Sequence, residues 1–181
     1  MHDEAHDVLP RLLDHIGFRE GLLIGHSDGA SIAAIYAGSR QDFRVRGLCL
    51  IAPHFFVEDM MVAAIADART AYERTDLRAK LARWHTHVDV AFHGWNGAWL
   101  DPEFRRWDIQ EFLPYVRVPI QIIQGEDDQY GTTRQIAAAE ALTTCPLEVA
   151  LFPGVKHAPH REAADATLSA ISGFVAAVLR N

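Results

Sequence analysis

Apolar side chains gather in four short runs that alternate with stretches of helical periodicity. The runs cover residues 21–25, 45–53, 118–125 and 147–154. The first run is typical of a buried strand, and the runs at 118–125 and 147–154 show strand-like periodicity. Because helical stretches separate successive runs, the pattern predicts an α/β fold with a mostly parallel sheet flanked by helices.

Helical periodicity is clearest at the two ends of the chain and after the first apolar run. Residues 4–16 form an amphipathic pattern that stops at Gly17, a residue type that commonly ends helices. Small side chains at helical spacing across residues 30–37 predict a helix that packs closely on the sheet. A further helix is expected at 132–143. A closing helix carries an apolar stripe made of Leu168, Ile171, Phe174, Val175 and Val178.

The middle of the chain contains no strand-like run, and its apolar side chains recur at helical spacing. The last helix of this region is expected to start in the stretch DPEF, where Asp101 fits the N-cap and Pro102 fits the first helical position. The sequence therefore predicts two parts. Residues 1–54 together with 117–181 form the core, and residues 55–116 form a helical cap inserted into it.

Composition narrows the possible partners and the location of the protein. The chain has 17 Lys and Arg against 24 Asp and Glu, a net charge of −7, which argues against nucleic acid and anionic membrane surfaces. Cys49 and Cys145 show neither metal-ligand nor disulfide spacing, as suits a reducing compartment. The apolar runs are shorter than a membrane span, and the first residues are acidic where a signal peptide is basic. We therefore expect a cytoplasmic protein that does not associate with membranes.

The first apolar run ends in Gly25-His26-Ser27-Asp28-Gly29, which fits the pattern G-x-S-x-G. Between a strand and a helix, this pattern is typical of a sharp turn that exposes a nucleophilic serine. The two glycines are expected to relieve the crowding that a Cβ atom would cause. The N-terminus of the following helix would direct backbone N–H groups at developing negative charge.

A serine nucleophile needs a base, and the sequence offers ten histidines. His157 is the favoured base, because it lies on the loop between the last apolar run and the closing helix. His160, three residues later, is the competing choice. A carboxylate that orients the base is expected in the stretch GEDDQYG, which follows the third run and offers Glu126, Asp127 and Asp128.

The other histidines are interpreted as ordinary polar residues. Three lie in the solvated N-terminal helix, and His54, His85, His87 and His93 lie in or beside the expected cap. The His85-x-His87 spacing suggests a metal, but no carboxylate or cysteine pattern completes such a site. We therefore expect no metal and no organic cofactor.

From about residue 4 to its C-terminus, the sequence resembles the α/β-hydrolase superfamily. The resemblance is carried by GHSDG at 25–29, GEDD after the third run and the PGVKH loop, which follow the family's order of serine, acid and histidine. A helical cap after the run that ends at Pro53 adds to the likeness. The family pattern implies Asp128 as the acid, His157 as the base and the backbone N–H of Asp28 as one oxyanion donor.

The resemblance has one departure. Only about 20 residues precede the G-x-S-x-G motif, where family members usually place further strands and an HG-type loop that supplies the second oxyanion donor. The strand that ends at Ser27 is therefore expected to form an exposed apolar edge. The explanations are a start assigned too late, a truncated form, or a compact variant that completes its sheet by forming a homodimer.

Aromatic side chains are frequent in the middle region, with the densest stretch at HGWNGAWLDPEFRRW. An aromatic lid over a serine would exclude water and favour an acyl or aromatic group of moderate size. Alternatively, these rings form the small core of the cap itself. Trp95, Trp99 and His26 are the predicted substrate-binding residues.

The leading hypothesis is a serine hydrolase that cleaves a carboxylic ester or a related small acyl compound. Ser27 attacks the carbonyl, His157 moves the proton, and Asp128 orients His157. An alternative is hydrolysis of a carbon–carbon bond in a diketone-like product of aromatic breakdown, with the same serine and histidine. Another is a truncated hydrolase fold that is weakly active or inactive and serves as a binding module.

Overall fold

The computed structural model describes residues 1–180 and divides into two compact units. The first unit comprises Met1–Phe55 and the residues from Asp108 onward, and the second comprises Phe56–Trp107. No helix among the described residues combines the length and the apolar character that crossing a membrane requires.

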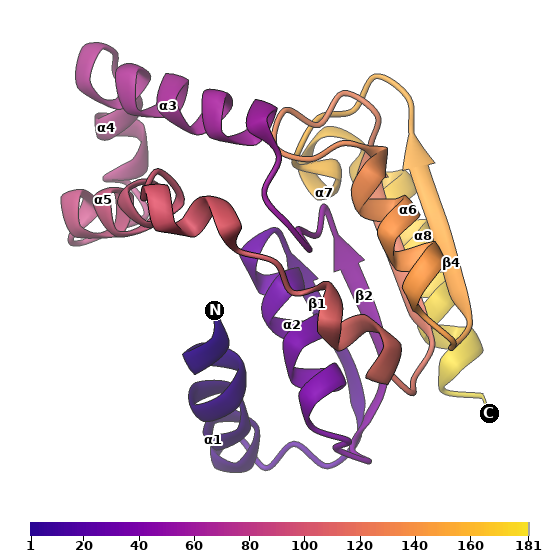
Figure 1. Cartoon of the computed structure of the whole chain (residues 1–181). Coiled ribbons are helices and arrows are strands. Elements are labelled where there is room, and N and C mark those ends of the chain that lie inside the picture. The colour runs from indigo at the N-terminus through magenta and orange to yellow at the C-terminus, as the bar shows by residue number, and fades with distance from the viewer. Residues whose placement is uncertain (181) are drawn as a thin grey trace. The chain divides into compact units, whose positions relative to one another are not determined.

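A parallel sheet forms the centre of the first unit (Figure 1). Its strands are β1 (Gly21–His26), β2 (Val45–Ile51), β3 (Ile120–Gly125) and β4 (Leu147–Phe152). They lie side by side in the order β1-β2-β3-β4, and every neighbouring pair is parallel. The prediction of a parallel sheet is confirmed, and all four strands present their carboxyl ends at one edge of the sheet.

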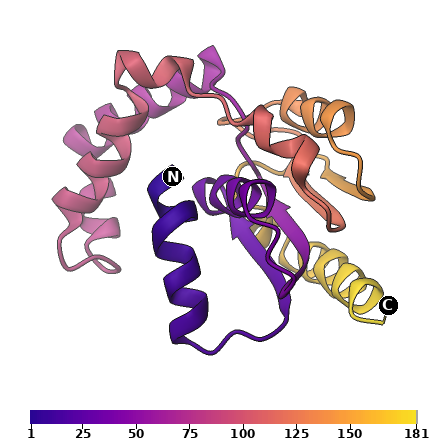
Figure 2. The same ribbon diagram turned by 60° about the horizontal axis from the view of Figure 1, so that its bottom comes forward.

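Helices cover both faces of this sheet (Figure 2). Side chains alternate between the two faces along a strand, so Cys49 and Ile51 of β2 share one face. On this face they pack with Ile123 of β3 and with Phe174 and Val178 of the closing helix. The helix that follows β1 contacts β1 and β2. The helices of the first unit are η1 (Glu4–Val8, a π-helical turn), α1 (Leu9–His15), α2 (Asp28–Ser39), η3 (Gln110–Tyr115), α6 (Thr133–Leu142), α7 (Pro159–Glu162) and α8 (Ala164–Val178).

The expected stripe on α8 is only partly buried. Phe174 and Val178 are buried and Ile171 packs against them, whereas Leu168 is 63% exposed. Helical spacing places Leu168 on the same side of the helix, but this residue precedes the part of α8 that contacts the sheet, which begins at Ala170 and Ile171.

The second unit is helical, as the sequence predicts. Its elements are α3 (Asp59–Arg74), α4 (Leu77–Leu81), α5 (Val88–Trp99) and the 3₁₀ turn η2 (Pro102–Arg106). Tyr72 of α3 and Phe92 of α5 stack with ring centroids 3.7 Å apart. Asn96 of α5 is buried and donates to the carbonyl of Ile65, and its own carbonyl oxygen accepts from Arg69.

The boundaries of this unit differ slightly from the expected cap at 55–116. Residues 108–116 group with the first unit, because η3 contacts α2 and α6 and because Leu113 and Val116 are buried. The stretch DPEF starts a single 3₁₀ turn, and the Asp101 side chain caps it by accepting from the backbone N–H of Glu103. The role of the second unit as a cap stays a prediction.

Strand β1 lies at the edge of the sheet, as predicted, and Ile24 in its middle is 51% exposed. Unpaired backbone groups along an apolar edge strand can pair with another chain. Of the three explanations for this edge, the compact homodimer predicts that the purified chain pairs along β1 with a second copy. Sedimentation should then give about twice the 20.2 kDa of one chain.

Ile24→Lys should shift the protein towards the monomer, because a lysine on an edge strand opposes further pairing. Val149→Lys is the matched control, since Val149 is 40% exposed on β4 at the opposite edge. A wild-type chain that sediments as a monomer would contradict this prediction.

Candidate active site

Ser27 occupies a strained turn between β1 and α2. Its backbone has φ 56° and ψ −123°, in the region of positive φ that residues with a Cβ rarely adopt. Its backbone N–H donates to the carbonyl of Ile51 on β2, at 2.9 Å. Strain of this kind persists only where the surrounding structure enforces it, and it concentrates at functional sites.

The two glycines of the motif play different steric roles. A Cβ atom on Gly25 would lie 2.3 Å from the carbonyl oxygen of Gly29 and 2.6 Å from the backbone nitrogen of Ala30. A Cβ atom on Gly29 would meet nothing within 4 Å. The expectation that both glycines relieve crowding is therefore wrong for Gly29, because its Cβ direction points into open space.

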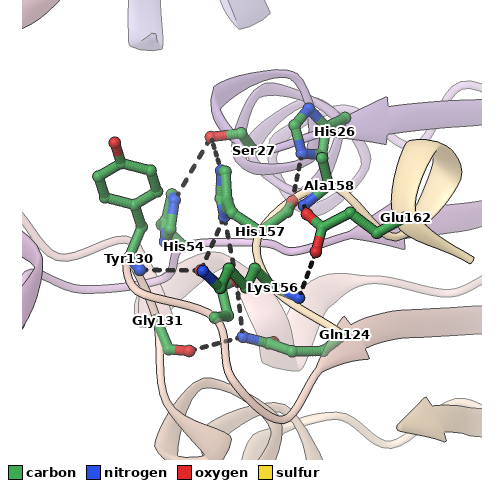
Figure 3. Close-up of polar contacts among 11 residues, drawn as sticks. His26, Ser27, His54, Gln124, Tyr130, Gly131, Lys156, His157, Ala158 and Glu162 are labelled. Atoms are coloured by element: carbon green, nitrogen blue, oxygen red, sulfur yellow. Dashed lines mark hydrogen bonds and ion pairs between the residues drawn. The ribbon is translucent and has the colours of Figure 1, made fainter. Parts of the chain in front are cut away.

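His157 lies between Ser27 and Asp128, and Figure 3 shows its ring beside the Ser27 side chain. Its Nε2 is 3.0 Å from Ser27 Oγ, and its Nδ1 is 2.9 Å and 3.0 Å from the two oxygens of Asp128. A carboxylate only accepts hydrogen bonds, so Nδ1 carries the proton of a neutral imidazole. Nε2 then has a lone pair for the hydroxyl proton of Ser27.

Buried polar groups hold Asp128 in place. The carboxylate accepts from the backbone N–H of Tyr130 at 2.8 Å and from the amide of Gln124 at 3.2 Å. Asp128 is 4% exposed, whereas Glu126 and Asp127 are exposed to solvent. Of the three carboxylates left open by the residues alone, the structure places Asp128 against His157.

Hydrogen bonds to Glu162 and His26 hold the loop that carries His157 (Figure 3). The carboxylate of Glu162 accepts from the backbone N–H groups of Lys156 and Ala158, at 2.9 Å and 3.2 Å. The imidazole of His26 donates from Nε2 to the carbonyl of His157 at 2.8 Å. Burial lowers the pKa of His26, which favours the neutral ring.

The competing base, His160, is exposed and makes an edge-on ring contact with His26 at 4.6 Å. It lies in the single turn of α7, three residues after His157, and the structure places His157 rather than His160 against Ser27. His26 itself contacts the His157 loop, so its predicted substrate-binding role stays a prediction.

His54 is a member of the site that the sequence reasoning missed. Its Nε2 is 3.4 Å from Ser27 Oγ, and its ring lies nearly parallel to that of His157, with centroids 5.5 Å apart and an angle of 11°. The side chain is 2% exposed. A signal was present: His54 follows the run that ends at Pro53, and carboxyl ends of neighbouring parallel strands meet at one edge.

Asp28 is the first residue of α2, so its backbone N–H lies at the positive end of the helix dipole, beside Ser27. Its oxyanion role stays a prediction. Trp95 and Trp99 lie on α5 in the second unit, where Trp95 contacts Phe92, and Trp99 contacts Trp107. Trp99 is buried, so aromatic packing within that unit accounts for it, and substrate binding by either tryptophan stays a prediction.

Metal-ligand geometry is absent from residues 1–180, where no three His, Cys, Asp or Glu side chains gather in a way that could hold an ion.

Comparison with known proteins identifies the family. The sequence model of the alpha/beta hydrolase family matches residues 2–170. The chain belongs to this family. The order of serine, acid and histidine on which the sequence resemblance rests therefore lies within a true alpha/beta hydrolase.

Solved structures support the same fold. A carboxylesterase structure from the thaumarchaeon Nitrososphaera gargenis has a TM-score of 0.77 at 18% identity, over 99% of this chain and 73% of that chain. E-2-(acetamidomethylene)succinate hydrolase gives 0.71 at 22% identity, over 96% and 72%. An esterase from Rhodococcus sp. ECU1013 gives 0.70 at 20% identity, over 98% and 74%. Among curated proteins, none matches the sequence.

The different space around Gly25 and Gly29 leads to a prediction about stability. Gly25→Ala should lower the free energy of unfolding by about 3 kcal/mol, because its Cβ would collide with backbone atoms that cannot move aside. Gly29→Ala should stay within about 1 kcal/mol of wild type, since Ala is tolerated in a helix where space is open. Urea unfolding followed by circular dichroism measures both. Equal destabilisation by the two substitutions would contradict the steric argument.

Proposed function

We propose that this hydrolase cleaves a carboxylic ester or a related acyl compound through an acyl-enzyme intermediate on Ser27. The observation that carries the proposal is the continuous hydrogen-bonded line from Ser27 Oγ through both nitrogens of His157 to Asp128. A serine hydroxyl next to an imidazole whose other nitrogen is held by a buried carboxylate is the arrangement that activates serine for acyl transfer.

In the first half of the proposed reaction, Ser27 Oγ attacks the carbonyl carbon and its proton passes to His157 Nε2. Asp128 stabilises the imidazolium that forms, and the backbone N–H of Asp28 donates to the oxyanion. His157 then gives the proton to the departing alkoxide, and the acyl group remains on Ser27.

In the second half, water takes the place of the alcohol. His157 Nε2 accepts a proton from the water as it attacks the acyl carbon, and the same proton returns to Ser27 Oγ when the carboxylic acid leaves. The two halves use one base and need no further titrating group. Esterases among the similar solved structures are consistent with this chemistry.

A fluorophosphonate probe tests the nucleophile directly. We expect the probe to label the wild-type chain and not Ser27→Ala, and labelling of His157→Ala should be slower by about a hundredfold or more, because the general base is lost. His160→Ala is the matched control and should be labelled at the wild-type rate, since His160 is exposed and it is His157 that lies against Ser27. Labelling of Ser27→Ala, or none of wild type, would rule out the proposal.

The carboxylate has its own test with a chromogenic ester. Asp128→Asn should lower kcat by about a thousandfold to ten-thousandfold, because an amide can stabilise the wrong tautomer of His157 and cannot balance the imidazolium charge. Asp127→Asn should be neutral, since this exposed side chain lies outside the site.

A panel that pairs esters with diketones distinguishes acyl-ester cleavage from carbon–carbon bond hydrolysis. Faster turnover of the diketones would overturn the ester assignment.

A further inference from the structure

His54 is held in position as firmly as the residues of the proposed reaction. Its carbonyl accepts from the hydroxyl of Ser31 at 2.6 Å, and its N–H donates back to the same hydroxyl at 3.3 Å. The next backbone N–H, that of Phe55, donates to the amide oxygen of Gln135 at 2.8 Å. Ser31 and Gln135 are both fully buried. Two helices, α2 and α6, therefore fix the segment on which the imidazole is mounted.

Backbone strain marks the same place. Among residues 1–180, only Ser27 and Ala52 combine a side chain beyond glycine with a positive φ, at 56° and 47°. Each lies just past the carboxyl end of its strand, β1 or β2, and these strands are neighbours. Ala52 therefore forms a strained turn two residues before His54. It is comparable to the strained turn at Ser27, which presents the hydroxyl.

Hydrogen-bond accounting gives the direction of the contact between His54 and Ser27. A serine hydroxyl has one proton and two lone pairs. The proton of Ser27 belongs on the side of His157, where Nε2 has a lone pair, because Nδ1 faces Asp128. The second imidazole, with Nε2 at 3.4 Å, can then pair with Oγ only by donating a proton to a lone pair.

We propose that His54 is a positioning residue of this hydrolase: its neutral imidazole donates the Nε2–H to Ser27 Oγ and so holds the hydroxyl in the orientation that faces His157. The inference rests on the proposed function. With the lone pair occupied by His54, the hydroxyl proton has one favoured direction, and the same donor stabilises negative charge on Oγ as that proton leaves.

The electrostatic surroundings support a neutral ring. Burial, and next the charge on His157, lower the pKa of His54 to about 3, against an opposing contribution from Asp128 and a smaller lowering by His26. A charged His54 would repel the imidazolium that forms on His157, 5.5 Å away. Because His54 remains uncharged across the working range of pH, His157 can take up its proton without that repulsion.

Two substitutions separate hydrogen bonding from packing. His54→Leu fills a similar volume without a donor, and we expect it to lower kcat for a chromogenic ester by about ten- to a hundredfold with little change in KM. The rate of fluorophosphonate labelling should fall by the same factor. His54→Gln places an amide N–H at a similar reach and should recover most of the lost rate. His15→Leu, on an exposed histidine at the end of α1, is the matched control and should behave as wild type.

Urea unfolding of each variant accompanies the kinetics, so that rates are compared only between folded proteins. Equal loss of rate in folded His54→Leu and His54→Gln, or no loss in folded His54→Leu, would overturn the positioning role. So would a change confined to KM, because orienting the nucleophile acts on the chemical step.

Nitrogen NMR of histidine-labelled wild type gives a readout that needs neither a variant nor activity. We expect the His54 ring in the Nε2–H tautomer, with no titration between pH 5 and pH 9. The assignment comes from the resonance that disappears in His54→Gln. A ring protonated at Nδ1, or one that titrates near the ordinary histidine pKa, would overturn the inference. If the chain neither reacts with the probe nor cleaves esters but shows the expected tautomer, the proposed function is wrong, whereas the hydrogen bond from His54 to Ser27 stands.

Discussion

The backbone conformation of Ser27 is the constraint on which the rest of the site depends. A residue with a Cβ keeps a φ of 56° only because the N–H of Ser27 donates to Ile51, while α2 begins at the next residue. The turn also requires that Gly25 have no side chain, since a Cβ there would collide with the first turn of α2. The pairing of β1 with β2 therefore bears directly on the candidate site, because the hydrogen bond from Ser27 to Ile51 at the end of the two strands also holds the turn that presents the hydroxyl.

Three imidazoles lie close together at the candidate site, those of His157, His26 and His54, and their different surroundings favour different protonation states. His157 faces a buried carboxylate and has the partner that a protonated ring needs. His26 and His54 have their pKa values lowered, first of all by burial, and act as neutral groups. One donates to the loop carrying His157, and the other lies against Ser27. In the proposed reaction, His157 alone gains and loses the proton, while His26 and His54 stay uncharged around it.

The sequence was sufficient for the parallel sheet and for the serine turn, because these depend on local patterns, whereas Asp128 and the edge position of β1 were inferred from the family resemblance. Apolar runs and helical spacing are short-range signals, and G-x-S-x-G constrains its own turn. His54 was missed because its importance comes from β2 lying next to β1, which is a tertiary relation. The same limit applies to residues 108–116, whose helical spacing resembles that of the second unit although η3 contacts α2 and α6. The open space beside Gly29 likewise depends on coordinates, since the motif alone treats both glycines alike.

Each strand of the sheet is followed by one polar side chain of the site: Ser27 after β1, His54 after β2, Asp128 after β3 and His157 after β4. Three strand spacings, about 14 Å, separate β1 from β4, so the loop after β4 must carry His157 back across the edge. The position after β2, which His54 occupies, then lies between Ser27 and the His157 loop and has to be filled by a side chain. An apolar side chain would fill it without the cost of burying an imidazole, a cost that only hydrogen bonding offsets. A buried histidine with its Nε2 towards Ser27 is therefore better explained by what it donates than by the volume it occupies.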